Sequence, residues 1–197
     1  MTNIDPKKLE GRLKHRSYEE IENELRTLQS DDLVAFLDGK ATRVADTAVS
    51  LLERRREVAL VTRSLITNRL RTALGRVRGI FVLSGFGVSA PETVEAYLHL
   101  LSDRSADVVS EALFGLVFMR RRDLLPILRE HLEHLPAGSP RCENFSEAIR
   151  ALEANDPSLF APGFLDAGNV WRLNEPAPPY TGEGKLEMDG KGEKTDG

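Results

Sequence analysis

The chain has 197 residues, of which 41% are hydrophobic and 6% aromatic, and its formal net charge is −4. This much apolar material supports a continuous core, and few aromatics beside abundant Leu, Val and Ala favour an all-α protein. The slightly acidic balance excludes a general attraction to nucleic acid through excess positive charge. Cys142 is the single cysteine, which excludes an intrachain disulfide and fits a reducing compartment.

Residues 1–16 are polar, and we expect them to form a flexible N-terminus. They lack the apolar segment of a secretory signal, and no stretch of the chain provides the roughly 20 apolar residues of a membrane-spanning helix. The expected location is therefore the cytoplasm.

The first predicted helix begins at Ser17. Ser17 and Glu20 have the spacing of a capping box, and Ile21, Leu25 and Leu28 then recur on one face. Apolar residues at helical spacing predict four more helices, over residues 30–37, 41–55, 57–66 and 69–86.

Pro91 indicates the start of the next helix, because proline is tolerated at the first helical position. The helices that follow are predicted to begin at Asp103 or Ser105, at Asp123 and at Cys142. After Asn155 the helical period ends. We expect the irregular segment 156–175, with Phe160 and Trp171 among its apolar residues, to dock on the last helix pair, the alternative being a free tail. Residues 176–197 are rich in Pro, Gly and charge, which predicts disorder.

A short pattern recurs along the chain, in which a small residue is followed four positions later by leucine. The four copies are Ala48 and Leu52, Gly79 and Leu83, Ala112 and Leu116, and Ala148 and Leu152. Their small residues are 31, 33 and 36 positions apart, which is close to the length of one helix pair in a solenoid.

Paired helices of this length resemble HEAT and HEAT-like repeats, and the resemblance covers residues 31–155. It implies an α-α superhelix of about eight to nine helices, with the repeat domain over residues 17–155. Gly75 and Arg76 depart from the pattern, because other copies carry Val44-Ala45 or Val108-Val109 at the same place. Armadillo-type or irregular α-α packing stays open.

The resemblance implies macromolecular binding and no particular chemistry. We therefore expect a non-catalytic scaffold for a partner protein, acting as an adaptor, an assembly factor or an inhibitor such as an immunity protein. No nucleotide-binding loop, serine nucleophile motif or zinc-protease motif occurs, and no cofactor is expected. His131 and His134 lie three positions apart, but no third ligand accompanies them, and we expect no metal.

Residues 54–122 contain 12 Arg and 6 acidic residues, a net charge of +6. Ten of these arginines lie at or between the ends of predicted helices, and we expect them to form one basic ridge that binds the partner: Arg54, Arg55, Arg56, Arg69, Arg71, Arg76, Arg78, Arg120, Arg121 and Arg122. Such a ridge would bind an acidic protein or, as an alternative function, nucleic acid. Arginines at helix ends also offset the helix dipole without any partner. Some HEAT-like proteins are bilin lyases, which is a third possibility from the resemblance alone.

Overall fold

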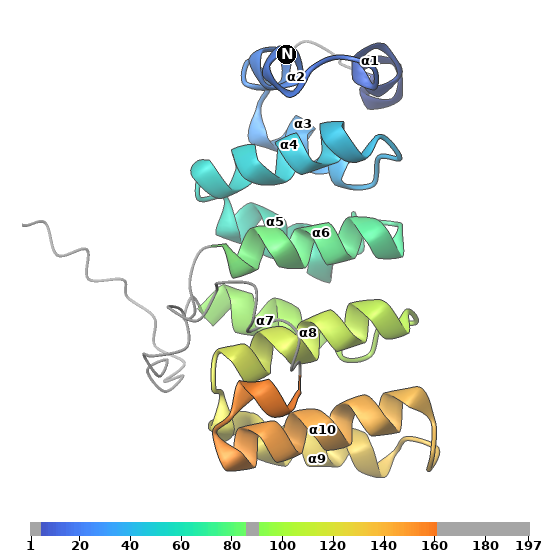
Figure 1. Cartoon of the computed structure of the whole chain (residues 1–197), viewed down its shortest axis with the longest axis vertical. Coiled ribbons are helices and arrows are strands. Elements are labelled where there is room, and N and C mark those ends of the chain that lie inside the picture. Colours follow the sequence, from blue (N-terminus) through green and yellow to red (C-terminus); the bar gives the residue numbers. More distant parts are fainter. Residues whose placement is uncertain (1–4, 86–90, 161–197) are drawn as a thin grey trace, which may run out of the picture.

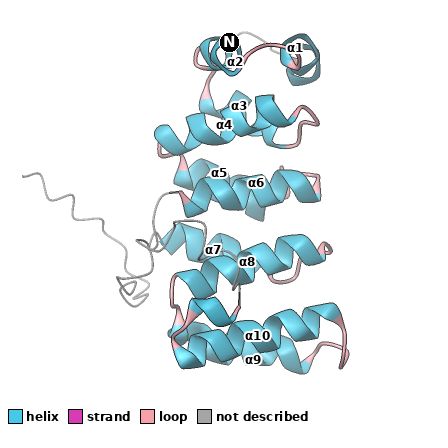
Figure 2. Ribbon diagram, in the orientation of Figure 1, coloured by secondary structure: helices cyan, strands magenta, loops and turns pink. Residues whose placement is uncertain are grey.

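A computed structural model describes residues 5–85 and 91–160 of the chain. These residues form ten α-helices and two short 3-10 helices, with no strand among them (Figures 1 and 2). The protein is therefore all-α, as predicted. The ten α-helices exceed the expected upper number of nine by one, because the N-terminal segment is itself helical.

The helices form five successive pairs along the long axis of the molecule (Figure 1). The first helices of the pairs are α1 (Pro6–Leu13), α3 (Ser30–Leu37), α5 (Val58–Ile66), α7 (Pro91–Leu100) and α9 (Leu125–Glu133). The second helices are α2 (Tyr18–Leu25), α4 (Thr42–Arg54), α6 (Ala73–Ser84), α8 (Ala106–Phe118) and α10 (Pro140–Ala154). The 3-10 helices are η1 (Arg122–Leu124) and η2 (Pro157–Leu159).

Contacts run from each pair to its neighbour. The second helices touch in series from α2 through α4, α6 and α8 to α10, and the first helices do so from α1 through α3 and α5 to α7. A stack in which each unit touches its neighbours is compatible with the predicted solenoid. The superhelical path implied by the resemblance to HEAT repeats stays a prediction.

The N-terminus is the main correction to the sequence-based expectation. Residues 6–13 were expected to be flexible, but they form α1, which the carboxylate of Asp5 caps by accepting from Lys7 N at 3.0 Å. Pro6 occupies the first turn, where a proline costs little. Leu9 and Leu13 are buried, 8% and 4% exposed. The helix contacts α3, and its Glu10 accepts a hydrogen bond from Ala41 N, but two leucines are too few to give a periodic signal in the sequence.

Side-chain caps fix where several helices begin, and two of these starts differ from the predicted ones. The capping box of α2 is confirmed, because Ser17 Oγ accepts from Glu20 N and Glu20 Oε2 accepts from Ser17 N. Thr72 Oγ1 accepts from Gly75 N at 2.9 Å, so α6 begins at Ala73 and not at residue 69. Ser139 caps α10, which begins at Pro140, two residues before the predicted start.

Small residues at the repeated positions let the helices approach closely. Ala48, Ala112 and Ala148 have no exposed surface. At Gly79 an added Cβ would lie 3.0 Å from side-chain atoms of both Leu65 and Leu70. The repeated pattern therefore marks packing positions between neighbouring helices.

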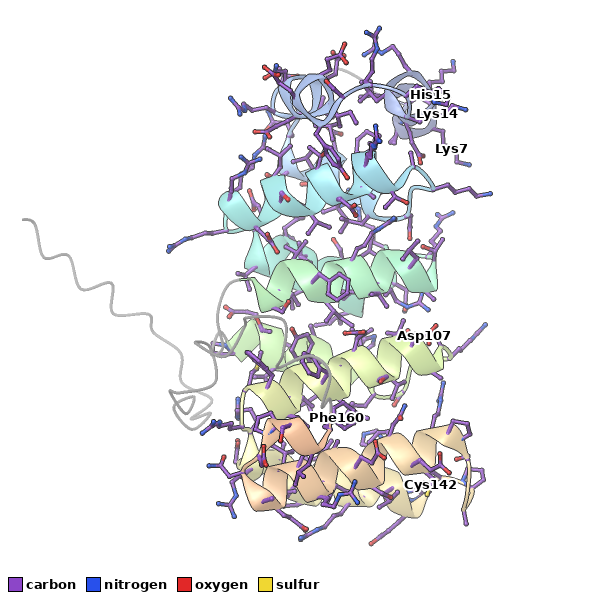
Figure 3. All side chains as sticks on the ribbon, in the orientation of Figure 1. Lys7, Lys14, His15, Asp107, Cys142 and Phe160 are labelled. Atoms are coloured by element: carbon purple, nitrogen blue, oxygen red, sulfur yellow. The ribbon has the colours of Figure 1, made fainter. Side chains whose placement is uncertain are left out.

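The C-terminal part of the described chain packs against the last helices. Pro157 of η2 is buried, and the ring of Phe160 lies 6.4 Å from that of Phe114 in α8 (Figure 3). Of the segment 156–175 that was predicted to dock on the last helix pair, η2 contacts α10 and Phe160 contacts α8. Residues 161–175 and the predicted disordered tail 176–197 lie outside the described residues, as does Phe86, the last residue of the helix predicted over 69–86. Within the described helices, none combines the length and the apolar character needed to cross a bilayer.

Four helices end on a non-glycine residue with a positive φ: Arg56, Asn68, Arg120 and Asn155. At Arg56, φ is 55°, and Glu57 N donates to Leu52 O at 3.3 Å, which is the 6→1 hydrogen bond of a Schellman motif. A residue with a Cβ is strained in this conformation, and glycine is not.

We expect Arg56→Gly to raise the free energy of unfolding by about 0.5–1 kcal/mol, because it relieves the left-handed strain at the end of α4. The measurement is urea unfolding followed by circular dichroism. Arg56→Ala is the control, since it removes the exposed side chain and keeps the Cβ, and it should change stability by less than about 0.5 kcal/mol. Equal effects of both substitutions would contradict this explanation.

Candidate functional site

Two arginines of the predicted ridge are buried inside the protein. Arg78 is 4% exposed, and its Nη1 donates to Leu37 O at 2.9 Å and to Gly39 O at 2.7 Å. It therefore neutralises the carbonyl end of α3 in the preceding pair. Arg121 is 3% exposed and hydrogen bonds to the carboxylate of Asp123, which lowers the pKa of Asp123. Arg78 and Arg121 are consequently too buried to bind a partner, and their assignment to the ridge was wrong.

Arg55 and Arg76 also connect neighbouring parts of the stack. Arg55 donates to Leu28 O and Arg26 O, both at 2.8 Å, in the link between α2 and α3. Arg76 Nε lies 2.6 Å from Asp103 Oδ2, and these side chains are only 14% and 9% exposed. Both arginines therefore hold the fold together.

Of the remaining arginines, two form ion pairs near the surface. Arg54 Nη1 lies 3.1 Å from Glu22 Oε1, and Arg69 pairs with Asp31. Arg120 is partly buried at its positive-φ position, whereas Arg56, Arg71 and Arg122 are exposed. The ten arginines thus do not form one exposed ridge, and partner binding by the exposed members stays a prediction.

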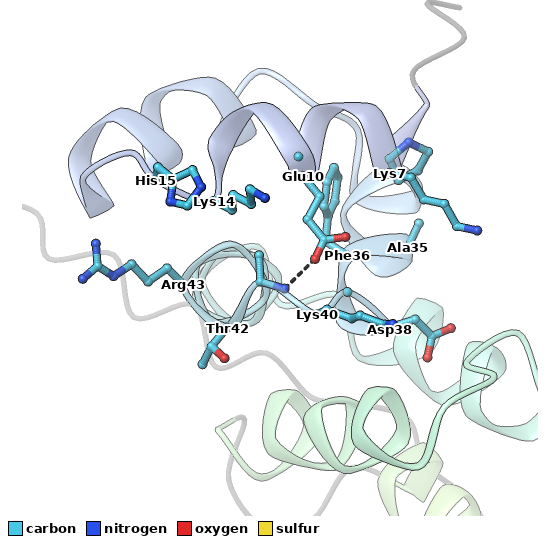
Figure 4. A pocket seen from close by; sticks show the side chains of 14 residues that line it. Lys7, Glu10, Lys14, His15, Ala35, Phe36, Asp38, Lys40, Thr42 and Arg43 are labelled. Carbon is cyan, nitrogen blue, oxygen red and sulfur yellow. Dashed lines mark hydrogen bonds between the residues drawn. The ribbon is translucent and has the colours of Figure 1, made fainter.

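The structure reveals a cationic cleft at the N-terminal end of the stack, which we call the N-terminal cleft. It lies between α1 and the start of α4, with a volume of about 750 Å³ (Figure 4). Its lining residues come from three segments: Pro6, Lys7, Glu10, Gly11, Lys14 and His15; Ala35, Phe36, Asp38 and Gly39; and Lys40, Ala41, Thr42 and Arg43. Positions 7, 11 and 14 recur at helical spacing, so one face of α1 supplies the first wall.

Positive charge predominates in this cleft. Among the described residues, Lys7, Lys14 and Lys40 form no ion pair. The guanidinium of Arg43 lies 5.6 Å from the centre of the Tyr18 ring, a cation–π contact that leaves its charge in place.

The two carboxylates of the cleft bind backbone amides. Glu10 Oε1 accepts from Ala41 N at 2.5 Å, and Asp38 accepts from Arg71 N and Thr72 N, both at 2.9 Å. They therefore fix the loops around the cleft and do not pair with its lysines.

Sequence reasoning missed the N-terminal cleft. Residues 1–53 carry a net charge of −3, and α1 was expected to be unstructured. The spacing of Lys7, Gly11 and Lys14 is a helical signal, but it has meaning only once α1 is known to be a helix. Figure 3 shows Lys7, Lys14 and His15 together at one end of the stack.

A second candidate surface is the outer face of α6, which we call the α6 stripe. Leu74 and Phe81 are 53% and 45% exposed, and Val77 between them is partly buried. The inner face of the same helix carries Ile80, Val82 and Leu83, all buried. This helix is therefore apolar on both faces, which is typical of a helix covered on both sides.

Groups that often carry chemistry have structural contacts in this protein. The ring of His131 stacks on Phe145 at 5.7 Å, and His134 Nδ1 lies 2.7 Å from Glu130 O. In residues 5–85 and 91–160, no three His, Cys, Asp or Glu side chains are grouped to hold a metal ion. Cys142 lies partly buried in the first turn of α10.

In the described part of the chain, the pKa values of Glu111 and Tyr97 are raised above their ordinary values, mainly by burial. The pKa of Glu111 is raised by desolvation and then by repulsion from Asp107, and burial raises that of Tyr97. Tyr97 packs so tightly against α8 that a Cβ on Gly115 would lie 2.8 Å from its Cζ. Both belong to the packing of α7 against α8.

Comparison of the chain with protein families, with curated proteins and with solved structures gave no match.

We expect Arg78→Met to lower the free energy of unfolding by about 2–4 kcal/mol, because Leu37 O and Gly39 O then lose their donor inside the protein. Urea unfolding measures the change. Arg63→Met is the control, since Arg63 is exposed on α5, and it should alter stability by less than about 0.5 kcal/mol. If Arg78→Met lowered the free energy of unfolding by less than about 0.5 kcal/mol, the buried guanidinium would not stabilise the end of α3.

Glu111→Gln should raise the melting temperature at pH 7. The raised pKa means that folding disfavours the charged carboxylate, so Glu111 destabilises the fold increasingly as the pH rises above the unfolded-state pKa. The difference between variant and parent should disappear below about pH 4, where both states carry a protonated Glu111. Melting temperatures of variant and parent, measured at several pH values between about 4 and 7, test this pH dependence. Glu95→Gln, on the exposed face of α7, is the control. A difference that does not depend on pH would contradict it.

Proposed function

We propose that the chain is a non-catalytic, HEAT-like protein-binding scaffold, which serves its partner protein as an adaptor, an assembly factor or an inhibitor of the immunity-protein kind. The observation that carries the proposal is the α6 stripe. A helix with apolar residues on both faces buries one face in the stack, and the other face is suited to a partner.

The position of the stripe supports binding to a protein surface. It lies on the layer of second helices, in the middle of the stack, with α4 on one side and α8 on the other (Figure 1). Neighbouring helices hold it rigidly, so little conformational entropy is lost when a partner packs against it. Aromatic side chains such as Phe81 are the type that contributes most to protein interfaces.

The charged residues of the stack support the same function. Most of the arginines considered for nucleic-acid binding have hydrogen bonds or ion pairs within the chain. Nucleic acid requires cations that are free to contact phosphates along a track. Arg56, Arg71 and Arg122 alone do not provide such a track, so a protein partner is the better proposal.

Affinity capture tests this function. The full-length chain, immobilised and exposed to extract of its own cells at low ionic strength, should retain a specific protein. Phe81→Ser should weaken the binding about tenfold or more, because it removes an aromatic anchor from the interface. The control is Ile127→Ser on α9, where Ile127 is 37% exposed and lies outside the stripe.

Two results would contradict the proposal. One is the recovery of no protein by the parent chain. The other is an equal loss for Phe81→Ser and Ile127→Ser, since the capture would then not depend on the α6 stripe. Circular dichroism of each variant verifies that the helices are intact.

A further inference from the structure

We propose that the N-terminal cleft is a second binding site, which takes an extended acidic peptide with apolar residues between its carboxylates. This site is independent of the α6 stripe and lies at the end of the stack (Figure 4). Charge, size and the chemistry of its walls carry the proposal.

The first argument is the charge balance of the cleft. Lys7, Lys14, Lys40 and Arg43 supply four positive charges and Glu10 and Asp38 two negative ones, so the net charge of the lining is +2; both carboxylates accept hydrogen bonds from backbone amides. Like charges held around one cavity repel each other, and an acidic ligand relieves this repulsion. Six of the ten arginines of the predicted ridge have hydrogen bonds or ion pairs within the chain, whereas Lys7, Lys14 and Lys40 form no ion pair among the described residues.

The second argument is the shape of the cleft. About 750 Å³ is within the size range of ligand-binding pockets, and it accommodates several side chains of a peptide. In Figure 4, Lys7 and Arg43 project at opposite ends, and Lys14 lies in the space between α1 and α4. Cations at both ends and in the middle suit a ligand that runs along the cleft, with several negative charges in a row.

The walls of the cleft also offer a hydrogen-bond acceptor and apolar surface, which suit a peptide. Glu10 Oε1 is bonded to Ala41 N, and its other carboxylate oxygen accepts no hydrogen bond from a described residue. The second carboxylate oxygen of Glu10 is therefore available to accept a hydrogen bond from a backbone N–H of a bound peptide. Pro6, Ala35 and the methylene stems of the lysines add apolar wall surface for side chains between the acidic ones.

Gly11 provides a sharp test of the site. It lines the cleft from α1, and a Cβ built there meets no atom within 4 Å, so a side chain extends into the cleft without disturbing the core. Gly11→Glu and Gly11→Gln introduce side chains of the same size, and both residues favour a helix. They differ only in the negative charge that Glu places among the lysines.

The experiment measures fluorescence anisotropy of a labelled synthetic peptide of alternating glutamate and valine, titrated with the full chain at low ionic strength. We expect saturable binding that weakens as salt is added. Gly11→Glu should weaken it about tenfold or more, and Gly11→Gln at most about threefold. Lys14→Gln should weaken it severalfold, whereas Lys8→Gln, on the same helix but outside the cleft, should leave it unchanged.

Three outcomes would overturn the proposal. The first is the absence of saturable binding by the parent chain. The second is an equal effect of the two Gly11 variants, or of Lys8→Gln and Lys14→Gln. The third is tighter binding of a single-stranded oligonucleotide that depends on Lys14, which would assign the cleft to nucleic acid. Because Phe81→Ser should not alter peptide binding, failure of this site and failure of the α6 stripe are distinguished.

Discussion

The stack depends on hydrogen bonds and ion pairs that join one helix pair to the next. These bonds lie at the edge of the stack where a loop connects the first and second helix of each pair. Glu10 of α1 holds Ala41 N, Asp38 holds two amides before α6, and Arg76 of α6 pairs with Asp103 before α8. Apolar packing supplies most of the stability of helices such as these, but it is not directional. Polar bonds at the loops fix the position of each pair relative to its neighbour, because a displaced pair would leave buried polar groups without partners.

The same bonds decide which charges remain for binding. An arginine that neutralises a helix end or pairs with a buried carboxylate belongs to the fold, and this is the role of Arg55, Arg76 and Arg78. In the N-terminal cleft, Lys7, Lys14 and Lys40 form no ion pair with any described residue. The two proposed binding surfaces, the N-terminal cleft and the α6 stripe, therefore do not depend on these arginines.

The helical architecture was predictable because short sequence patterns, spanning only a few residues, determine where helices begin and pack. Ser17 with Glu20, the small residue of each repeat with its leucine, and Pro91 each report a helix boundary or a packing position within a few residues. The N-terminal cleft was not predictable, because α1 has only Leu9 and Leu13 to mark it and its cations face a loop some 30 residues away in the sequence. Likewise, the arginines could be counted from the sequence, but partners such as Leu37 O and Asp103 are long-range contacts that a count of charges does not show.

The most direct test of this account is a double-mutant cycle on Arg76 and Asp103, the ion pair that joins α6 to the loop before α8. Arg76→Gln, Asp103→Asn and the double variant are unfolded in urea, and the coupling free energy is taken from the four stabilities. The account predicts a coupling of at least about 1 kcal/mol, because both side chains are largely buried and in direct contact. A coupling within about 0.3 kcal/mol of zero, as for an exposed pair, would show that these bonds do not fix the stacking of the helix pairs.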